Sequence, residues 1–333
     1  MRFNNVLVTG GAGYVGCLLV PQLLKAGHGV TVFDTFWYEK HLPAHPNMKF
    51  VEGDIRETSK LAAAFKGIDA VIGLACISND ASFELDEKLS TSVNMNAFEP
   101  MVMAAKQAVV KRFIYASSSS VYGVSDKPNV TEDHPLLPLT LYNKYKGLCE
   151  PLLFKHQSRD FVCVTIRPAT VCGYSARTRM DLSVNILTNN AVMNGKITVF
   201  GGAQLRPNLH IQDMCDLYEL LLAVPDEKIS GQTFNAGYQN MSIMDIAQIV
   251  KRVVQEEYPQ KGEIQIVTTP SDDNRSYHIN SDKIARALGF RPKYTIEDAA
   301  RDLCRAFKSG KLPESLTDDI YYNVRRMKRL GIK

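Results

Sequence analysis

The chain has 333 residues, of which 45% are hydrophobic and 22% charged, a composition typical of a globular protein with a large core. Its net charge of +4 suits a small anionic ligand and is too weak to indicate nucleic-acid binding. No apolar run approaches the ~18 residues that a membrane span needs, and VLVTG follows Met1 too closely to leave room for a signal peptide.

Seven cysteines are scattered along the chain, and no two of them form a CxxC pair. An odd number of separate thiols argues against a disulfide framework and against a metal site, and it predicts free thiols in a reducing compartment. We therefore expect a cytoplasmic protein with no bound metal, no membrane partner and no nucleic-acid partner.

The first half of the chain alternates short apolar segments, which predict strands, with segments that carry apolar residues at helical spacing. In chain order, the expected strands are 6–10, 29–34, 48–54, 69–77, 112–117 and 161–168. The expected helices are 15–26, 61–67, 87–110 and 141–157. Because the strands are apolar on both faces, they predict a parallel sheet that is covered by helices on both sides.

A glycine-rich turn, TGGAGYVG (9–16), follows the first expected strand and begins the first expected helix. Glycines there let the backbone approach a dinucleotide diphosphate, toward which the helix N-terminus directs its amides. Asp34 ends the second strand 18 residues after Gly16, where a carboxylate accepts from both ribose hydroxyls and repels a 2′-phosphate. The pattern therefore favours NAD over NADP. Asp54, at the next strand end, is expected to contact adenine, although both aspartates also suit ordinary turns.

Tyr142 and Lys146 are four residues apart in YNKYK, so they share one face of an expected helix. A lysine and a nicotinamide cation beside the phenol would lower the tyrosine pKa from its usual value near 10 and make it a base. The alternative is a solvated helix face. The run SSSS (117–120) follows the fifth strand, at the edge where the ligand crevice of a parallel sheet lies. We expect the serines and Tyr142 to meet over the nicotinamide.

Together these motifs resemble the extended short-chain dehydrogenase/reductase family, in particular its NAD-dependent nucleotide-sugar epimerase/dehydratase branch, which is UDP-glucose 4-epimerase-like. The resemblance spans nearly the whole chain, and it rests on TGGAGYVG, the GD at 53–54, SSSSVYG, YNKYK, IRPATVCG, RPNLHIQD and NRSYHINSDKIARALGF. It implies an α/β fold, with a Rossmann-type doubly wound parallel sheet and a smaller mixed C-terminal substrate lobe, and NAD as the cofactor.

The resemblance also implies that Ser118, Tyr142 and Lys146 are catalytic. The Ser118 hydroxyl would bind the substrate oxygen at the carbon being oxidised, and Tyr142 would remove its proton. Ser120 lies where relatives often carry a small hydroxyl residue. Ser117 and Ser119 are expected to complete the strand and the turn.

The residues implied for the cofactor lie in the glycine-rich turn and after the following strands. They are Gly10, Gly13, Tyr14, Val15, Gly16, Asp34, Asp54, Ile55, Leu74, Ala75, Tyr142 and Lys146. The residues implied for the substrate include two arginines whose guanidinium groups suit a diphosphate, with a surface ion pair as the alternative for each. This substrate set is Ser118, Ser119, Ser120, Asn94, Asn185, Arg206 and Arg275.

Two departures from the family pattern bear on the reaction. Strand four reads GLAC where relatives tend to read HLAA, which places Gly73 and Cys76 beside the expected nicotinamide site. Glucose-type dehydratases carry an Asp-Glu pair where this chain has Ser119 and Ser120, which argues against 4,6-dehydration.

Beyond about residue 170 the alternation is less regular, and the segment 170–185 has no clear period. We expect an NAD-binding Rossmann domain at 1–170, which 205–235 rejoins, and a mainly substrate-binding lobe at 171–333.

The function that this resemblance favours is an NAD-dependent epimerase that transiently oxidises C4 of a sugar nucleotide. The alternatives are an NDP-sugar C4 dehydrogenase or ketoreductase that releases its product, a dehydratase or decarboxylase, and a non-catalytic NAD-binding sensor. Members of the family pair through two long helices, here about 87–108 and 141–157, so a homodimer is expected.

Overall fold

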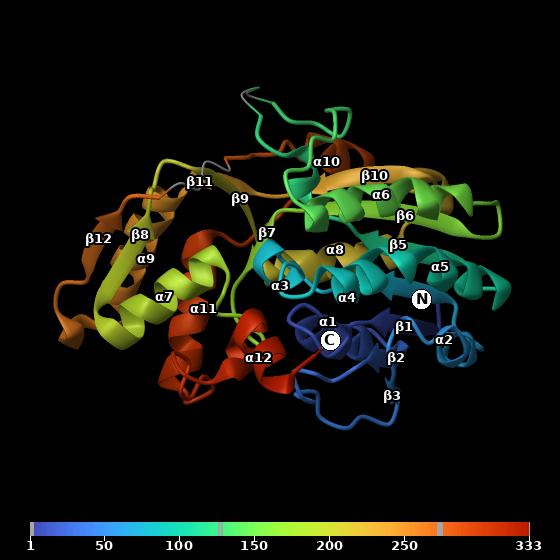
Figure 1. Cartoon of the computed structure of the whole chain (residues 1–333), viewed down its shortest axis with the longest axis horizontal. Helices are drawn as coiled ribbons and strands as arrows, with labels where there is room; N and C mark the ends of the chain where they lie inside the picture. The colour runs from blue at the N-terminus through green and yellow to red at the C-terminus, as the bar shows by residue number, and fades with distance from the viewer. Residues whose placement is uncertain (1–2, 126, 128, 272–275, 333) are drawn as a thin grey trace.

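The computed structural model describes residues 3–125, 127, 129–271 and 276–332. Its centre is a seven-stranded parallel sheet, and a smaller lobe lies at one end of the molecule (Figure 1). The strands of the large sheet are β1 (Asn5–Thr9), β2 (Gly29–Asp34), β3 (Met48–Glu52), β4 (Ala70–Gly73), β5 (Arg112–Ala116), β6 (Val162–Pro168) and β10 (Gln232–Ala236).

The strand order, β10-β6-β5-β4-β1-β2-β3, reverses its direction of growth between β1 and β4. The chain builds outward from β1 to β3 on one side and from β4 to β10 on the other. Thr9 of β1 pairs with Phe33 of β2 on one side and with Gly73 of β4 on the other. The loops at the carboxyl ends diverge at such a switch point and leave a crevice for a ligand. The predicted doubly wound sheet is confirmed.

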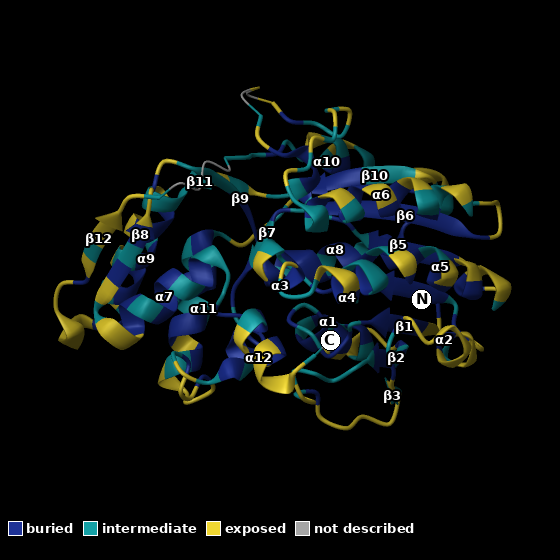
Figure 2. Ribbon diagram, in the orientation of Figure 1, coloured by how far each residue is buried: buried dark blue, intermediate teal, exposed yellow. Residues whose placement is uncertain are grey.

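Helices cover both faces of this sheet, and Figure 2 shows the inner strands between them as buried, whereas the edge strand β3 has no buried residue. On one face lie α1 (Gly16–Lys25) and α8 (Ile211–Ala223); on the other lie α2 (Thr58–Ala64), α5 (Phe98–Gln107) and α6 (Leu141–Lys155). Because side chains alternate along a strand, Val6 and Val8 of β1 join the core under α1, and Leu7 joins the opposite core. This two-sided burial explains the continuous apolar runs in the sequence.

The helix expected at 87–110 is interrupted. It consists of α4 (Glu87–Thr91), a π-helical segment η1 (Ser92–Asn96) and α5. Such wide turns are rare and are frequent at functional sites. Here the turn carries Asn94, whose side-chain amide accepts from the backbone N of Ile77 and donates to its O, both at 2.8 Å. Asn94 thereby fixes the chain that follows β4.

The smaller lobe packs helices against a two-stranded parallel sheet, and a three-stranded sheet connects it to the large one (Figure 1). Its elements are α7 (Ser183–Asn194), β8 (Lys196–Phe200), α9 (Ile243–Glu257), β12 (Gln265–Thr269) and α11 (Ile296–Lys308). The connecting sheet contains β7 (Thr170–Cys172), β9 (Leu205–His210) and β11 (Gln239–Ser242). The segment 205–235 was expected to rejoin the Rossmann domain. Its strand β9 belongs to the connecting sheet, whereas α8 packs on the large sheet and β10 is a strand of it.

The remaining elements are short. They are α3 (Asp80–Phe83), η2 (Ser119–Tyr122), η3 (Asp226–Lys228), η4 (Pro259–Lys261), α10 (Asp282–Leu288), η5 (Asp319–Tyr321) and α12 (Asn323–Leu330). Among the residues that the structure describes, no helix is both long enough and apolar enough to cross a membrane.

The C-terminal segment returns to the large sheet, so that α12 lies near α1 and β2 (Figure 1). Arg326 of α12 donates to the backbone O of Trp37 at 2.8 Å and pairs with Glu39 at 3.1 Å. It also pairs with Asp319 at 3.2 Å. These contacts hold α12 over the loop that follows β2, next to Asp34.

Candidate active site

A cavity of about 380 Å³ lies at the carboxyl ends of the strands around the switch point. It runs along the glycine-rich turn, Asp34, the residues after β4, the serine run and the first turns of α6. Every residue that the sequence analysis assigned to the cofactor or to catalysis lines this one cavity. Their individual roles stay predictions.

The glycine-rich turn is tight because its backbone approaches neighbouring backbone closely. Gly10 has a φ of +69°, and a Cβ there would lie 2.8 Å from the Cα of Ala75. At Gly16 a Cβ would lie 2.3 Å from the carbonyl oxygen of Gly11. Only glycine therefore allows the N-terminus of α1 to face the cavity, which is the arrangement that fits the diphosphate of NAD.

The Asp34 carboxylate lies at the end of β2 and accepts from two backbone amides. Its Oδ2 accepts from the N of Ala12 and its Oδ1 from the N of Phe36, each at 2.9 Å. Burial raises the pKa of Asp34, and these amides oppose that shift. A carboxylate has about four acceptor positions, so Asp34 can still accept from both hydroxyls of an adenosine ribose. The side chain therefore fits NAD.

We predict that Asp34 determines the choice of cofactor. Replacing Asp34 by serine and Thr35 by arginine should raise the affinity for NADP relative to NAD roughly tenfold or more, because a repelling carboxylate is lost and a phosphate partner is added. Isothermal titration with both dinucleotides measures the ratio, and Thr35→Arg alone is the control. Equal affinity of the unmodified protein for NAD and NADP would contradict the assignment.

Asp54 also lines the cavity, but its carboxylate is engaged by the side chain two residues away. Arg56 donates to it from Nε at 3.0 Å and from Nη2 at 2.7 Å. Burial raises the pKa of Asp54, and the hydrogen bonds from Arg56 outweigh burial and lower it. A contact with adenine at Asp54 stays a prediction.

Tyr142 and Lys146 lie on one face of α6 and both line the cavity. The Lys146 Nζ donates to the backbone O of Ala116 at 2.7 Å and lies 6.0 Å from the centre of the Tyr142 ring. Burial raises the pKa of Tyr142 well above 10, the neighbouring Cys76 thiol raises it further, and the Arg179 guanidinium opposes the shift. Lys146 was the residue expected to lower the pKa of Tyr142, and the role of Arg179 was not expected from the sequence.

The serine run separates into two pairs with different surroundings. The Oγ atoms of Ser118 and Ser120 lie 2.6 Å apart, and Ser120 donates to the side-chain oxygen of Asn143 on α6. Ser118 also caps η2 by accepting from the backbone N of Ser120 at 3.2 Å. Ser117 and Ser119 are buried. Ser117 donates to Glu150 at 2.6 Å, as expected of a structural residue.

A buried ion pair supports the serine run from α6 and β6. Arg167 donates from Nε at 3.0 Å and from Nη2 at 2.6 Å to the two oxygens of Glu150. Its Nη1 donates to the hydroxyl of Tyr122 at 2.7 Å, and that hydroxyl donates to Asn235 of β10. This network ties β6 and β10 to α6 and η2, and it reaches Ser117 through Glu150.

A second cavity of about 230 Å³ adjoins the first, because Asn79, Asp80, Ser120 and Asn143 line both. Arg206 lines the second cavity, where the sequence analysis expected a substrate diphosphate. Asn94 and Asn185 line neither of these cavities. Arg275, the other expected diphosphate ligand, lies outside the described residues.

Asn185 is fully buried and holds the loop that connects β7 to α7. Its side chain accepts from the backbone N of Gly173 at 3.0 Å and donates to the backbone O of Arg179 at 2.8 Å. It also donates to the hydroxyl of Tyr14 at 3.1 Å. Asn185 therefore supports the residues that line the cavity and does not line it itself, although it was expected to contact the substrate.

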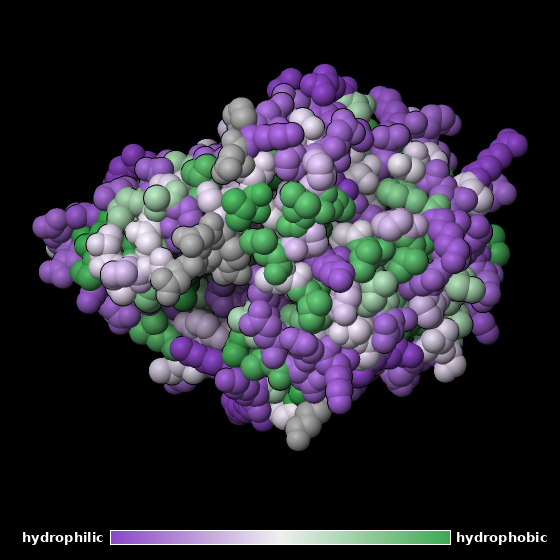
Figure 3. Space-filling model, turned by 45° about the horizontal axis from the view of Figure 1, so that its top comes forward, coloured by the Kyte–Doolittle hydropathy of each residue, from purple (hydrophilic) through white to green (hydrophobic). Residues whose placement is uncertain are grey.

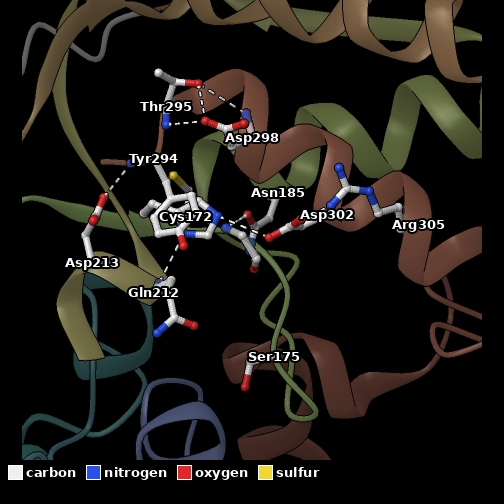
Figure 4. A network of polar contacts seen from close by, with 12 residues as sticks. Cys172, Ser175, Asn185, Gln212, Asp213, Tyr294, Thr295, Asp298, Asp302 and Arg305 are labelled. Carbon is white, nitrogen blue, oxygen red and sulfur yellow. Dashed lines mark hydrogen bonds and ion pairs between the residues drawn. The ribbon is translucent and has the colours of Figure 1, made fainter. Parts of the chain in front are cut away.

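The second half of the RPNLHIQD motif takes part in a network of polar contacts, in which Figure 4 labels Gln212 and Asp213. The ring of His210 stacks at 5.0 Å on Tyr294 and lies 3.3 Å from a carboxylate oxygen of Asp302. Asp213, at the start of α8, accepts from the backbone N of Tyr294 at 3.0 Å. This network joins the N-terminus of α8 to α11 and packs against Gly173, where an added Cβ would lie 3.1 Å from the His210 ring.

Two arginines that were not expected from the sequence, Arg177 and Arg179, line the first cavity from the loop between β7 and α7. The available signal was the pair of cations in RTR within a segment without periodicity, which also reads as a solvated loop. Among the described residues, no group of three His, Cys, Asp or Glu side chains is placed to hold a metal ion.

Comparison with known proteins identifies the family of the chain. The model of the NAD dependent epimerase/dehydratase family matches residues 6–237. The UDP-glucose 4-epimerase of Lactobacillus helveticus is 28% identical over 87% of this chain and 92% of its own length. A 3 beta-hydroxysteroid dehydrogenase/Delta 5→4-isomerase of Mycobacterium tuberculosis is 32% identical over 70% of this chain and 64% of its own.

Among solved structures, the dTDP-glucose 4,6-dehydratase DesIV of Streptomyces venezuelae, which contains NAD, superimposes with a TM-score of 0.82. It is 24% identical, over 94% of this chain and all of its own, so it shows the same fold. The names of these relatives cover different reactions. The chain belongs to the NAD dependent epimerase/dehydratase family and is an NAD-dependent enzyme of the extended short-chain dehydrogenase/reductase type.

Proposed function

We propose that the protein is a sugar-nucleotide epimerase that transiently oxidises C4 of an NDP-sugar. The observation that carries this proposal is the convergence of Ser118, Tyr142 and Lys146 on one cavity with the glycine-rich turn and Asp34. The adjoining cavity, with Arg206 on its wall, offers room for a sugar nucleotide beside the same serines. The match to a UDP-glucose 4-epimerase over nearly its whole length supports this substrate class.

In this proposal Tyr142 removes the proton from the substrate O4 and later returns it. The Ser118 hydroxyl binds the same oxygen and is held for this by its cap position at η2. Lys146 stabilises the phenolate and orients the cofactor ribose. NAD, which the glycine-rich turn and Asp34 would hold, would supply the hydride acceptor and donor for C4, and rotation of the keto sugar between the two transfers would invert that carbon.

Elimination of water is disfavoured by the same loop. Ser119 and Ser120 stand where the glucose-type dehydratases carry an acid and a base, and Ser119 is only 2% exposed. A dehydrogenase that releases its product would share the first half of the mechanism. Asn323 and Met327 of α12 line the same cavity as Asp34, and a cofactor retained against them would favour epimerisation.

The proposal is tested by identifying what the protein binds and then what it converts. Small molecules released from the denatured purified protein should include NAD and a nucleotide sugar, detected by mass spectrometry. Incubation with that nucleotide sugar should give its C4 epimer by NMR, without reduced cofactor in solution. Stoichiometric release of reduced cofactor would identify a dehydrogenase, and failure to convert any nucleotide sugar would favour a sensor.

We also propose a homodimer paired through α5 and α6. The structure buries Met101 and Val102 against the large sheet, but it leaves Met103, Val109 and Leu148 at 43%, 74% and 41% exposure. Hydrophobic surface also gathers near the middle of the face shown in Figure 3. Analytical ultracentrifugation at micromolar concentration should show twice the chain mass of 37.1 kDa. A 37.1 kDa particle would contradict pairing, and Leu148→Glu should shift a true dimer toward that mass.

All seven cysteines are free. Free thiols are typical of a reducing compartment, and we therefore propose a cytoplasmic location.

A further inference from the structure

The loop between β7 and α7 places two buried guanidinium groups on the wall of the first cavity. Arg177 is 3% exposed and Arg179 is 8% exposed, and both line the cavity. The loop is fastened to the glycine-rich turn, because Ser175 donates to the backbone O of Tyr14 at 2.7 Å and Tyr14 donates to the O of Gly173 at 2.6 Å. The two arginines are therefore held in fixed positions relative to that turn.

Neither guanidinium has all of its hydrogen bonds satisfied. Arg177 donates from Nη2 to the side chain of Asn323 at 2.5 Å and lies 3.9 Å above the ring of Tyr38, while its Nε has no partner. Arg179 donates to Asp181 at 2.8 Å and to Ser78 at 3.0 Å, while its Nη2 has no partner. Buried donors without partners are costly, and a rotation of either side chain that brought its unpartnered nitrogen to an acceptor on a ligand in the cavity would remove this cost.

The pair also carries uncompensated positive charge. Within the described part of the chain, no carboxylate lies within ion-pair distance of Arg177, whereas Arg179 is paired with Asp181. Burial and repulsion from Arg179 lower the pKa of Arg177 to about 10, so it remains a cation at neutral pH. Asp34 and Asp181 interact with it only beyond ion-pair distance, so an anionic ligand in direct contact would lower the cost of burying this cation.

The position of the pair indicates which anion this is. Arg177 is close enough to Asp34 to lower the pKa of that carboxyl, and Arg179 is close enough to Tyr142 to lower the pKa of that phenol. Both guanidiniums line the same cavity as Asp34, expected at the adenosine ribose, and Tyr142, expected at the nicotinamide, and their loop is bonded to the glycine-rich turn. In a dinucleotide, the diphosphate is the anion that lies between these two ends.

We propose that Arg177 and Arg179 bind the diphosphate of the dinucleotide cofactor together with the glycine-rich turn. This assignment rests on the cofactor site of the proposed function and adds two ligands that the motifs of the sequence do not contain. Guanidinium groups bind phosphate oxygens through paired charge-assisted hydrogen bonds. The diphosphate would therefore accept hydrogen bonds both from backbone amides of the glycine-rich turn and from the two arginines.

The test compares ligands that contain and lack the diphosphate. Arg177→Met and Arg179→Met should each weaken binding of ADP-ribose about 10–100-fold, and each should change binding of adenosine less than about twofold. Trp37, the single tryptophan of the chain, lines the cavity and reports binding by fluorescence, with isothermal titration as the second readout. Arg177→Lys, which keeps the charge and loses the fork, should lie between wild type and Arg177→Met.

Two further ligands test whether the arginines instead bind a different phosphate group. UDP, titrated in the presence of saturating NAD, reports the sugar-nucleotide diphosphate, and NADP reports a 2′-phosphate. The proposal requires the loss to appear with ADP-ribose. A loss confined to UDP, or confined to NADP with NAD unchanged, would overturn it.

Arg326→Met is the matched control, because Arg326 is equally buried but has carboxylate partners and does not line the cavity. It should lower the free energy of unfolding, whereas Arg177→Met should not, since the ligand-free protein loses an unpaired buried cation. If Arg177→Met lowers the free energy of unfolding and weakens the binding of adenosine as much as that of ADP-ribose, then Arg177 has a structural role and the proposal is wrong. If the wild type binds ADP-ribose but the variants bind it equally well, this inference fails alone. If the wild type binds no dinucleotide, the proposed function fails with it.

Discussion

Replacing Tyr142 by phenylalanine should lower the turnover of the enzyme by at least about 10²–10⁴-fold, the usual contribution of a positioned general base. The substitution removes only the phenol oxygen, and the ring keeps its edge contact with Phe83 at 6.5 Å. Folding and NAD binding should therefore remain. Steady-state kinetics with the nucleotide sugar identified by mass spectrometry measures the loss, and full activity in this variant would contradict the mechanism.

The pH profile gives a second readout of the same residue. Burial raises the pKa of Tyr142, and a base acts in its deprotonated form, so kcat/KM should rise with pH through an alkaline limb. Lys146→Met should move this limb to higher pH, because it removes a cation that favours the phenolate. Ser118→Ala should leave the limb in place and cost less in rate, since it removes one hydrogen bond and no proton transfer.

Replacing Glu150 by alanine should lower the free energy of unfolding by about 3–5 kcal/mol, because it leaves Arg167 buried without its counterion. Arg167 and Glu150 are 6% and 4% exposed, and both oxygens of the carboxylate accept from the guanidinium. Urea denaturation followed by circular dichroism measures the loss. An unchanged midpoint would show that the pair carries no such energy.

The double variant Glu150→Met with Arg167→Met is the matched control, because it removes both charges of the buried pair and leaves neither unpaired. Replacing both members of a buried pair by apolar residues is often neutral or stabilising, so most of the stability should return. Activity should not return fully, because the Glu150 carboxylate also accepts from Ser117 and holds the serine run in place. Recovery of stability without recovery of rate would separate the two effects.

The parts of the site that were predictable from sequence are those with a local physical signature. A glycine-rich turn after an apolar strand, an aspartate at the next strand end and a tyrosine four residues before a lysine each depend on short spacings. The parallel sheet then brings the strand ends to one edge. For this reason Gly10, Asp34 and Tyr142, which lie far apart in the sequence, line the same cavity.

The parts that were missed depend on distant partners or on small changes of geometry. Arg177 is placed by Tyr14 and by Asn323, which is 146 residues away, and its loop has no periodicity. The π-helical turn at 92–96 was missed because one widened turn leaves the helical pattern of apolar residues nearly intact. The family resemblance implied that Asn185 binds substrate. Only the fold shows that its side chain bonds to the loop backbone and lines neither cavity.

The measurement that tests the proposed epimerisation most directly uses a nucleotide sugar deuterated at C4. The proposal predicts that the product epimer keeps the deuterium at C4, because the atom removed from one face of the sugar returns to the other face of the same molecule. Mass spectrometry and NMR of the product detect the label and its position. Product that has lost the label, together with deuterated reduced cofactor in solution, would contradict epimerisation and identify a dehydrogenase.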